Sequence, residues 1–203
     1  MPSGAPAVAV FDFDGTITRG DSTTAFCRAE FPGRLLPAVV RAAPCLAGHA
    51  LGLVGRQRVK EALLVELLGG REEPEIRRRA SDWAARRLPG MVRSGALERL
   101  RWHRSRGHRV VVASASLDLL LEPWAWTVGV DDVLATRLEV LDGRLTGRLA
   151  GPNCYGPEKV ARLRALLGDL AGVELYAYGD SRGDRELLAA ALHAVYRPFR
   201  DGR

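Results

Sequence analysis

Cysteine is scarce in this chain of 203 residues. The three cysteines, Cys27, Cys45 and Cys154, lie far apart and form no CxxC pair, which argues against a disulfide framework and against a zinc site. Such sparse use of cysteine is typical of a reducing compartment, so we expect a cytoplasmic protein.

A long uninterrupted apolar run is also missing. The most apolar stretch, residues 35–54, contains two prolines, an arginine and a histidine, so it does not predict a membrane-spanning helix. Two interpretations of this stretch stay open. It is either a buried helix or a surface that makes peripheral contact with an anionic membrane.

Lysine is almost absent, because Lys60 and Lys159 are the only two among 30 basic residues. The formal net charge of +6 is therefore carried by arginine. The densest arginine groups, at 77–79 and 99–106, fall on segments with helical periodicity, where a solvated helix face explains them. We expect no nucleic-acid partner.

Short β-prone apolar runs alternate with helical segments along most of the chain. Strands are predicted at 7–11, 109–113, 133–135, 175–178 and 194–196, and helices at 96–105, 117–128, 158–167 and 185–192. This alternation predicts an α/β fold with a Rossmann-like, mostly parallel sheet that carries helices on both faces.

Two insertions interrupt the alternation. Residues 21–88 contain no good strand and predict a helical cap, with breaks near Pro32-Gly33, Pro44, Gly69-Gly70 and Pro74. Residues 137–149 predict a small β-hairpin around Asp142-Gly143. We therefore expect a catalytic core made of residues 1–20 and 89–203, and a cap domain of residues 21–88.

Acidic residues follow the first predicted strand as Asp12-Phe13-Asp14-Gly15-Thr16. At a strand end, with Gly15 permitting a tight turn, two carboxylates can approach one hard cation such as Mg²⁺. The alternative is that Asp12 begins a turn and Asp14 caps a helix. Asp180 and Asp184 follow another strand at the same sheet edge, where Asp180 would complete the metal shell and Asp184 would orient its neighbours.

Candidate phosphate-binding groups lie at the end of another predicted strand and at the start of a predicted helix. Ser114 opens the segment Ser114-Ala115-Ser116 before a predicted helix, where a hydroxyl and free amides suit an anion, although an ordinary helix N-cap is the alternative. Lys159 stands in the first turn of a predicted helix, where a cation opposes the helix dipole and has no local electrostatic reason.

These motifs, in this order, resemble the haloacid dehalogenase superfamily. The resemblance runs from DFDGT at 12–16 through Ser114 and Lys159 to GDSRGD at 179–184, and so covers nearly the whole chain. The helical insertion after the first motif is similar to that of the phosphoserine-phosphatase-like branch, subfamily IB. Segments 135–139, 142–147 and 153–156 resemble the bacterial group that includes phosphatidylglycerophosphatase C.

The resemblance implies a magnesium-dependent phosphatase that acts through an aspartyl-phosphate. It makes Asp12 the nucleophile and Asp14 the acid–base residue, and it gives the phosphoryl oxygens to Ser114, Ala115 and Lys159. It places Mg²⁺ on Asp12, the backbone carbonyl of Asp14, and Asp180, with Asp184 behind them. Phosphotransfer to another acceptor, or a binding module without catalysis, are the alternatives.

The substrate is expected to be a small-molecule or lipid-head-group phosphate that meets the cap. Asp21 stands where the phosphoserine-specific relatives carry a glutamate, so it is a candidate substrate residue, with helix N-capping as the alternative. Arg58 and Lys60 are cap cations that suit a second anionic group, unless they simply face solvent.

Overall fold

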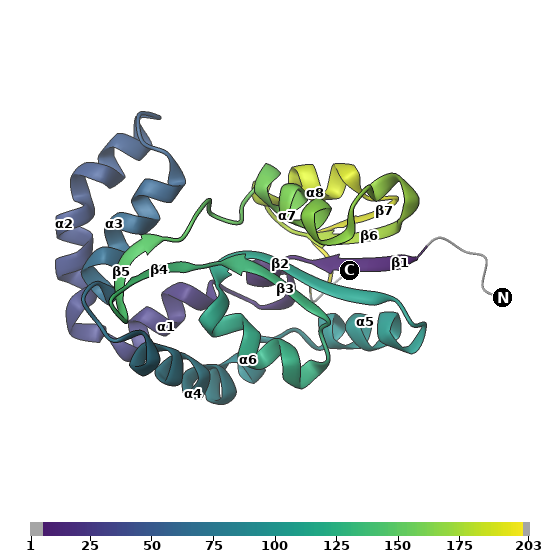
Figure 1. The fold of residues 1–203 in the computed structure, drawn as a ribbon, viewed down its shortest axis with the longest axis horizontal. Helices are drawn as coiled ribbons and strands as arrows, with labels where there is room; N and C mark the ends of the chain where they lie inside the picture. The colour runs from purple at the N-terminus through teal and green to yellow at the C-terminus, as the bar shows by residue number, and fades with distance from the viewer. Residues whose placement is uncertain (1–5, 201–203) are drawn as a thin grey trace.

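A five-stranded parallel sheet forms the centre of the molecule (Figure 1). The computed structural model describes residues 6–200. The strand order is β3-β2-β1-β6-β7. Its members are β1 (Ala7–Phe11), β2 (Arg109–Leu117), β3 (Asp132–Thr136), β6 (Glu174–Gly179) and β7 (His193–Tyr196). The predicted α/β fold is confirmed, and one strand is longer than expected, since β2 continues past Ala113 to Leu117.

Helices cover both faces of this sheet (Figure 1). On one face lie α5 (Ser94–Ser105) and α6 (Asp118–Val128), and on the other lie α7 (Pro157–Leu167) and α8 (Arg185–Ala190). The alternation of β1 explains the two layers. Ala9 and Phe11 pack into the cluster that contains α5 and α6, whereas Val8 and Val10 pack into the cluster that contains α7 and α8.

Four helices between β1 and α5 form a cap beyond one end of the strands (Figure 1). They are α1 (Ser22–Glu30), α2 (Pro32–Ala50), α3 (Arg56–Leu68) and α4 (Glu73–Met91). The breaks predicted near Pro32-Gly33, Gly69-Gly70 and Pro74 are confirmed, because they fall at helix ends.

The break predicted at Pro44 is wrong, since α2 runs through both Pro37 and Pro44. Each proline removes one helical N–H and leaves the carbonyl four residues earlier without its partner. Those carbonyls belong to Gly33 and Val40, which are exposed, as are both prolines. Water can therefore satisfy the carbonyls, and the helix continues.

The predicted hairpin is confirmed as β4 (Leu138–Leu141) and β5 (Arg144–Leu149), but it packs on the cap. Leu145 exchanges backbone hydrogen bonds with the linker after α3, since Gly70 N donates to Leu145 O and Leu145 N donates to Arg71 O, both at 2.8 Å. Gly147 lies so close to the backbone of Val65 that a Cβ atom would collide with it. The hairpin thus adds a second, distant chain segment to the cap.

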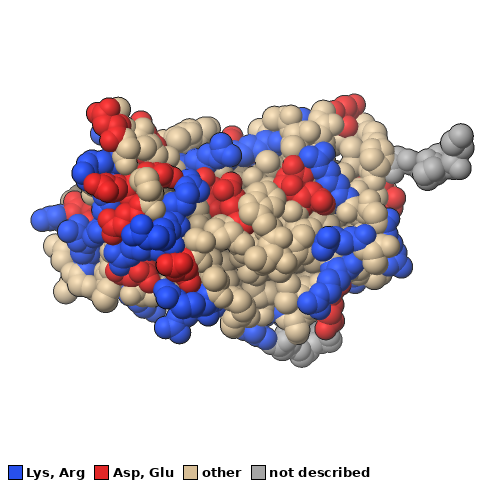
Figure 2. Space-filling view, turned by 60° about the horizontal axis from the view of Figure 1, so that its bottom comes forward, with Lys and Arg blue, Asp and Glu red and all other residues tan. Residues whose placement is uncertain are grey.

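One apolar cluster joins cap and core. It includes Phe26, Leu64 and Trp83 of the cap helices as well as Phe11 and Leu120 of the core. On the face shown in Figure 2, basic and acidic side chains are interspersed. Ion pairs join some of the charged side chains of the chain, for example Arg77 with Glu73 and Arg144 with Glu72. Among residues 6–200, no helix combines the length and apolar character needed to cross a membrane.

Candidate active site

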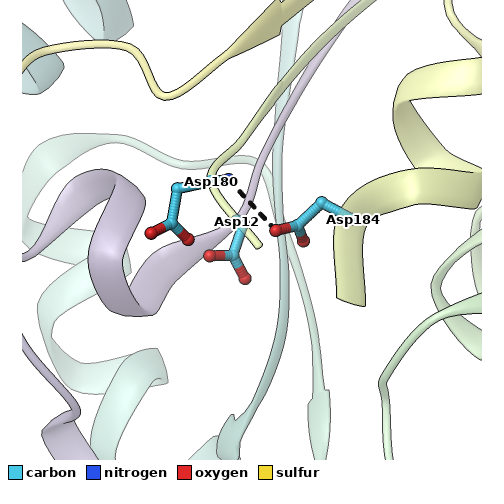
Figure 3. A group of neighbouring side chains, drawn as sticks. All are labelled: Asp12, Asp180 and Asp184. Carbon is cyan, nitrogen blue, oxygen red and sulfur yellow. Dashed lines mark hydrogen bonds between the residues drawn. The ribbon is translucent and has the colours of Figure 1, made fainter. Parts of the chain in front are cut away.

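Three aspartates converge at the carboxyl edge of the sheet (Figure 3). Asp12 follows β1, while Asp180 and Asp184 follow β6, and one carboxylate oxygen from each lies within 4.8 Å of the others. The backbone N–H of Asp180 donates to Asp184 Oδ2 at 3.1 Å, the bond drawn in Figure 3. The two motifs that sequence reasoning placed at one sheet edge therefore meet in space.

Gly15 allows the first motif to approach the second. Its φ of 86° is a left-handed conformation that favours glycine, and a Cβ atom at this position would lie 2.5 Å from Asp180 Oδ2. Glycine thus serves both the turn after Asp12 and the close contact with Asp180.

Lys159 is buried between two of these carboxylates. Its Nζ donates to Asp12 Oδ1 at 2.5 Å and to Asp184 Oδ1 at 2.6 Å. Burial alone would lower the pKa of Lys159, but the two carboxylates raise it above its ordinary value, so the ammonium stays charged. The helix that carries Lys159 does not explain a positive charge in its first turn. The explanation is the tertiary contact of Lys159 with the carboxylates of Asp12 and Asp184.

The charges of this group favour a cation. Burial raises the pKa of Asp12 to about 7, Lys159 opposes that rise, and Asp184 and Asp14 add to it. Three carboxylates converge here against two cations, since Lys159 bonds Asp12 and Asp184 while Arg200 Nη2 lies 3.1 Å from Asp180 Oδ2. Carboxylate oxygens are the ligands that Mg²⁺ prefers. The donor set therefore fits a divalent cation, which would return Asp12 to its charged form.

Asp184 is held in place by several donors. Its Oδ2 accepts from the backbone N–H groups of Asp180 and Ser181 and from the Ser181 hydroxyl, and its Oδ1 accepts from Lys159. Lys159 and these bonds lower the pKa of Asp184, although burial by itself would raise it. Both carboxylate oxygens of Asp184 thus accept hydrogen bonds from protein groups. This agrees with the predicted role of Asp184, which is to orient neighbouring residues of the site.

The carboxylate of Asp14 faces the cap side of the site. Its Oδ1 accepts from Ser22 N at 2.9 Å and from the Thr18 hydroxyl at 3.4 Å, and its Oδ2 accepts from the Ser116 hydroxyl. Burial raises the pKa of Asp14 to about 6, with Asp21 adding to the rise and the bonds from Ser116 and Ser22 opposing it. A carboxyl group with this pKa exchanges protons near neutral pH.

The segment that contains Ser114 forms a bulge inside β2. Ser114 pairs with Ala135 and Leu117 with Thr136, so Ala115 and Ser116 have no partners in the register with β3. The predicted end of the strand at this segment is wrong for that reason. The N-cap alternative for Ser114 is wrong as well, because the N-cap of α6 is Leu117 and Ser114 Oγ accepts from Ser116 N at 3.0 Å.

The three predicted cap residues, Asp21, Arg58 and Lys60, differ in their place relative to the cavity. Asp21 lines the cavity of the site and also caps α1, since its Oδ1 accepts from Thr24 N at 2.6 Å. Arg58 is exposed and does not line the cavity. Lys60 lines the cavity, and so does Arg56, because residues four apart share one face of α3 whereas Arg58 lies on another.

A cavity of about 520 Å³ lies between the cap and the sheet edge. Its polar floor carries Asp12, Asp14, Ser114 and Lys159. Its apolar wall comes from the cap, namely Cys27, Leu35, Ala38, Val39, Val59, Leu63, Leu64 and Leu67.

Three polar residues of the site escaped sequence reasoning in the roles they have here: Ser116, Asn153 and Lys60. Ser116 binds Asp14, while Asn153 and the backbone of Ala115 accept hydrogen bonds from Lys60. Lys60 carried a usable signal, because it is one of the two lysines of the chain. Asn153 lies in the segment 153–156 that carries part of the family resemblance, and Ser116 lies in the segment Ser114-Ala115-Ser116, but neither segment indicated these contacts.

Comparison with known proteins agrees with this geometry. Residues 9–189 match the haloacid dehalogenase-like hydrolase family model. The protein CicA of Caulobacter vibrioides is 37% identical over 196 residues, which cover 96% of this chain and 87% of CicA. A probable phosphatase of Mycobacterium tuberculosis is 32% identical over 97% of this chain and 70% of its own length.

The fold also agrees with a solved structure of the branch suggested by the sequence. A substrate-bound phosphoserine phosphatase superposes with a TM-score of 0.62 at 20% identity, covering 94% of this chain and 85% of the other. The two chains therefore share their fold over most of their length.

Proposed function

This chain belongs to the haloacid dehalogenase-like hydrolase family, and we propose that it is a magnesium-dependent phosphatase that hydrolyses phosphate monoesters through Asp12. One observation carries the proposal. Lys159 is buried and donates hydrogen bonds to Asp12 and Asp184, and a carboxylate oxygen of Asp180 lies within 4.8 Å of carboxylate oxygens of both. Asp14 stands on the same cavity with a pKa of about 6.

In the proposed first step, a carboxylate oxygen of Asp12 attacks phosphorus and the bond from phosphorus to the alcohol oxygen breaks. Asp14 gives its proton to that leaving oxygen, so the product is a neutral alcohol and an aspartyl-phosphate on Asp12. The Ser114 hydroxyl, the Ala115 backbone N–H and Lys159 would hold the phosphoryl oxygens, where such donors stabilise developing charge.

In the proposed second step, Asp14 is a carboxylate and takes a proton from water. The water oxygen attacks phosphorus, the bond to Asp12 breaks, and phosphate leaves with Asp14 protonated again. The burial of Asp14 serves both steps, because a pKa of about 6 keeps both protonation states accessible near neutral pH.

Asp12, the backbone carbonyl of Asp14, and Asp180 would hold Mg²⁺, with Asp184 orienting the group. When bound, the ion supplies positive charge that neutralises the phosphoryl oxygens. We also propose a division into a core of residues 1–20 and 89–203 and a cap of residues 21–88. Within this division the hairpin belongs to the core segment and packs on α3 of the cap.

We propose that the alcohol part of the substrate is partly apolar, as in a lipid phosphate or an apolar small molecule. The cap lines the cavity with seven aliphatic side chains and Cys27 beside six polar residues, and burial of apolar surface against the aliphatic part stabilises an apolar group by roughly 25 cal/mol per Å². Asp21 remains a proposed substrate contact, since it lines this cavity.

We further propose that α2 and the loop after it rest on an anionic membrane. Leu36, Val40, Leu51 and Leu53 are 63–80% exposed within residues 36–53. Arg34 and Arg41 are exposed too, and Arg41 forms an ion pair with Glu66 at 2.6 Å, so Arg34 supplies the positive charge beside these apolar side chains. The inner side of the same helix supplies Ala38 and Val39 to the cavity.

Co-sedimentation with liposomes checks the membrane proposal. The protein should bind vesicles that contain anionic lipid at low salt and release them at high salt. The double variant Leu51→Ser/Leu53→Ser should bind at least about 5-fold more weakly, because it loses two exposed apolar side chains. Equal retention by neutral and anionic vesicles, or none by either, would contradict the proposal.

A phosphatase screen with Mg²⁺ tests the catalytic proposal. Asp12→Asn should lower turnover at least about 10³-fold, because an amide oxygen does not form the aspartyl-phosphate. Asp82→Asn, an exposed carboxylate on cap helix α4, is the matched control and should retain full activity. Turnover by Asp12→Asn near the wild-type rate would refute the mechanism, and product appearing on an added alcohol would indicate phosphotransfer.

A further inference from the structure

Lys60 reaches from the cap into the core. It lies on α3, and its Nζ donates to the backbone carbonyl of Ala115 and to Asn153 Oδ1, the latter at 3.1 Å. Ala115 belongs to the bulge of β2 and lies 55 residues away in the chain. A lysine that buries its amine against a main-chain carbonyl needs a reason, because desolvation of an ammonium is unfavourable.

The peptide group that Lys60 contacts is the one next to Ser114. Its carbonyl belongs to Ala115, and its N–H belongs to Ser116 and donates to Ser114 Oγ at 3.0 Å. A chain of hydrogen bonds therefore runs from Lys60 through one peptide group to the Ser114 hydroxyl. Because hydrogen bonds in series polarise one another, the ammonium strengthens the bond that the Ser116 N–H makes.

This chain of bonds has a consequence for the Ser114 hydroxyl. Once its oxygen accepts from the Ser116 N–H, its own proton is directed away from that peptide group. Ser114 lines the cavity beside Asp12 and Lys159. The hydroxyl proton is then available for an oxygen of a bound phosphate.

The bulge makes this peptide group dependent on an outside partner. Ala115 and Ser116 are left out of the register with β3, so the ladder does not fix their peptide plane. Ala115 is half-buried and lines the cavity, while Ser116 is buried. A carbonyl left out of the sheet ladder needs another donor, and the cap lysine supplies one.

Asn153 holds Lys60 at the correct place. Asn153 Oδ1 accepts from the Thr136 hydroxyl at 3.0 Å as well as from Lys60, and its backbone N–H donates to Gln57 Oε1 at 3.2 Å. Thr136 ends β3 and Gln57 lies one turn before Lys60 on α3. The segment Asn153-Cys154-Tyr155-Gly156 thereby joins cap and core and leads directly into the helix that carries Lys159.

We infer that Lys60 is a positioning residue through which the docked cap orients the Ala115–Ser116 peptide group and, with it, the Ser114 hydroxyl for phosphate. The inference rests on the proposed function of Ser114. Burial lowers the pKa of Lys60 to about 8, against the opposing effect of Asp21 and Asp14, which agrees with an amine placed in the interior of the site.

The test compares Lys60→Met, Lys60→Arg and the control Arg86→Met, which removes an exposed cap cation on α4. Lys60→Met should lower kcat about 10–100-fold with KM changed less than about 3-fold, because the lost charge-assisted bond acts on the phosphate-binding group. Lys60→Arg should recover part of kcat, and Arg86→Met should match wild type. A raised KM with unchanged kcat in Lys60→Met would overturn the inference.

Amide hydrogen exchange supplies a readout that does not need turnover. In Lys60→Met, the Ser116 amide should exchange at least about 10-fold faster, while the amide of Val111 in the middle of β2 stays as in wild type. Lys60→Gln, which keeps a donor without charge, replaces Lys60→Met should the latter fail to fold. Unchanged exchange at Ser116 would overturn the inference.

The two proposals can fail separately. Turnover by wild type and its loss in Asp12→Asn decide the proposed phosphatase activity. If both hold and Lys60→Met turns over like wild type, the role of Lys60 is refuted while the phosphatase stands. If wild type is inactive on the screen, the Ser116 exchange rate still decides whether Lys60 orders the bulge.

Discussion

The side chains of the two lysines, Lys60 and Lys159, line the same cavity, although 99 positions of the sequence separate them. Lys159 bonds Asp12 and Asp184, and Lys60 bonds the main chain beside Ser114. A compact ammonium on a flexible stem can place three donors in a narrow space, whereas a guanidinium is planar and wider. In a chain that otherwise uses arginine, this geometric need explains why lysine stands at these two positions.

Gly15 is the residue whose replacement the structure tolerates least in the first motif. Gly15→Ala would hold a left-handed conformation at a cost of about 1–2 kcal/mol and would also push its Cβ against the Asp180 carboxylate. We expect a lower melting temperature and a Mg²⁺ requirement at least about 10-fold higher, measured as the Mg²⁺ dependence of turnover.

Gly20→Ala is the matched control for that substitution. No atom lies within 4 Å of a Cβ built at Gly20, and its φ is not in the left-handed region. It should change neither the melting temperature nor the Mg²⁺ dependence. Equal effects of the two substitutions would show that the contact between Gly15 and Asp180 is not what matters.

At the scale of elements, α2 is a helix whose sequence has low intrinsic helix propensity, because it contains Pro37 and Pro44. Two prolines inside it would end most helices, yet it spans Pro32–Ala50 because the freed carbonyls face solvent. The packing of Ala38 and Ala42 into the interior compensates for the lost hydrogen bonds. Tertiary contacts therefore hold a helix that local propensity does not favour.

Pro44→Ala should stabilise this helix. The substitution restores one helical hydrogen bond at an exposed position and is expected to raise the free energy of unfolding by up to about 3 kcal/mol. Urea unfolding measures the change, and amide exchange in residues 40–50 should slow. A decrease in stability would show that the proline at position 44 is needed for α2 to pack within the cap.

At the scale of the whole molecule, cap and core share one apolar cluster and several hydrogen bonds. Thr18 forms an antiparallel bridge with Val92, so the two chain crossings between core and cap helices lie side by side. The hairpin adds a further link, because it leaves the core after β3, packs on α3 and returns to α7. These links oppose independent unfolding of the cap.

We therefore expect one cooperative unfolding transition. Far-UV circular dichroism reports all helices, whereas tryptophan fluorescence reports Trp83 in the cap together with Trp102, Trp124 and Trp126 in the core. The two signals should give the same urea midpoint, because the cluster that joins cap and core is lost in a single step. Two separate midpoints would indicate a cap that unfolds before the core.

Much of the fold was predictable because it depends on local pattern. The apolar runs before Asp12 and Asp180 define buried strands, and Asp142-Gly143 defines the hairpin, where both residues adopt positive φ. Parallel strands bring their carboxyl ends to one edge whatever the details of packing. For this reason the meeting of Asp12, Asp180 and Asp184 could be expected from sequence order alone.

The remaining features depend on contacts between distant segments. Asp12 and Lys159 lie 147 positions apart, and Lys60 reaches Asn153 across 93 positions. The bulge at Ala115 and the docking of the hairpin on α3 have no local signature either. Such contacts are set by how preformed elements pack against one another, and a local pattern does not contain that information.

By itself, then, the sequence determined the sheet, the cap insertion and the acidic residues at the strand ends, because each follows from short-range periodicity and turn chemistry. Only the tertiary structure decided which face of α3 meets the core. That face carries Lys60 and not Arg58, because helix packing selects one stripe of side chains for burial and leaves the others in solvent.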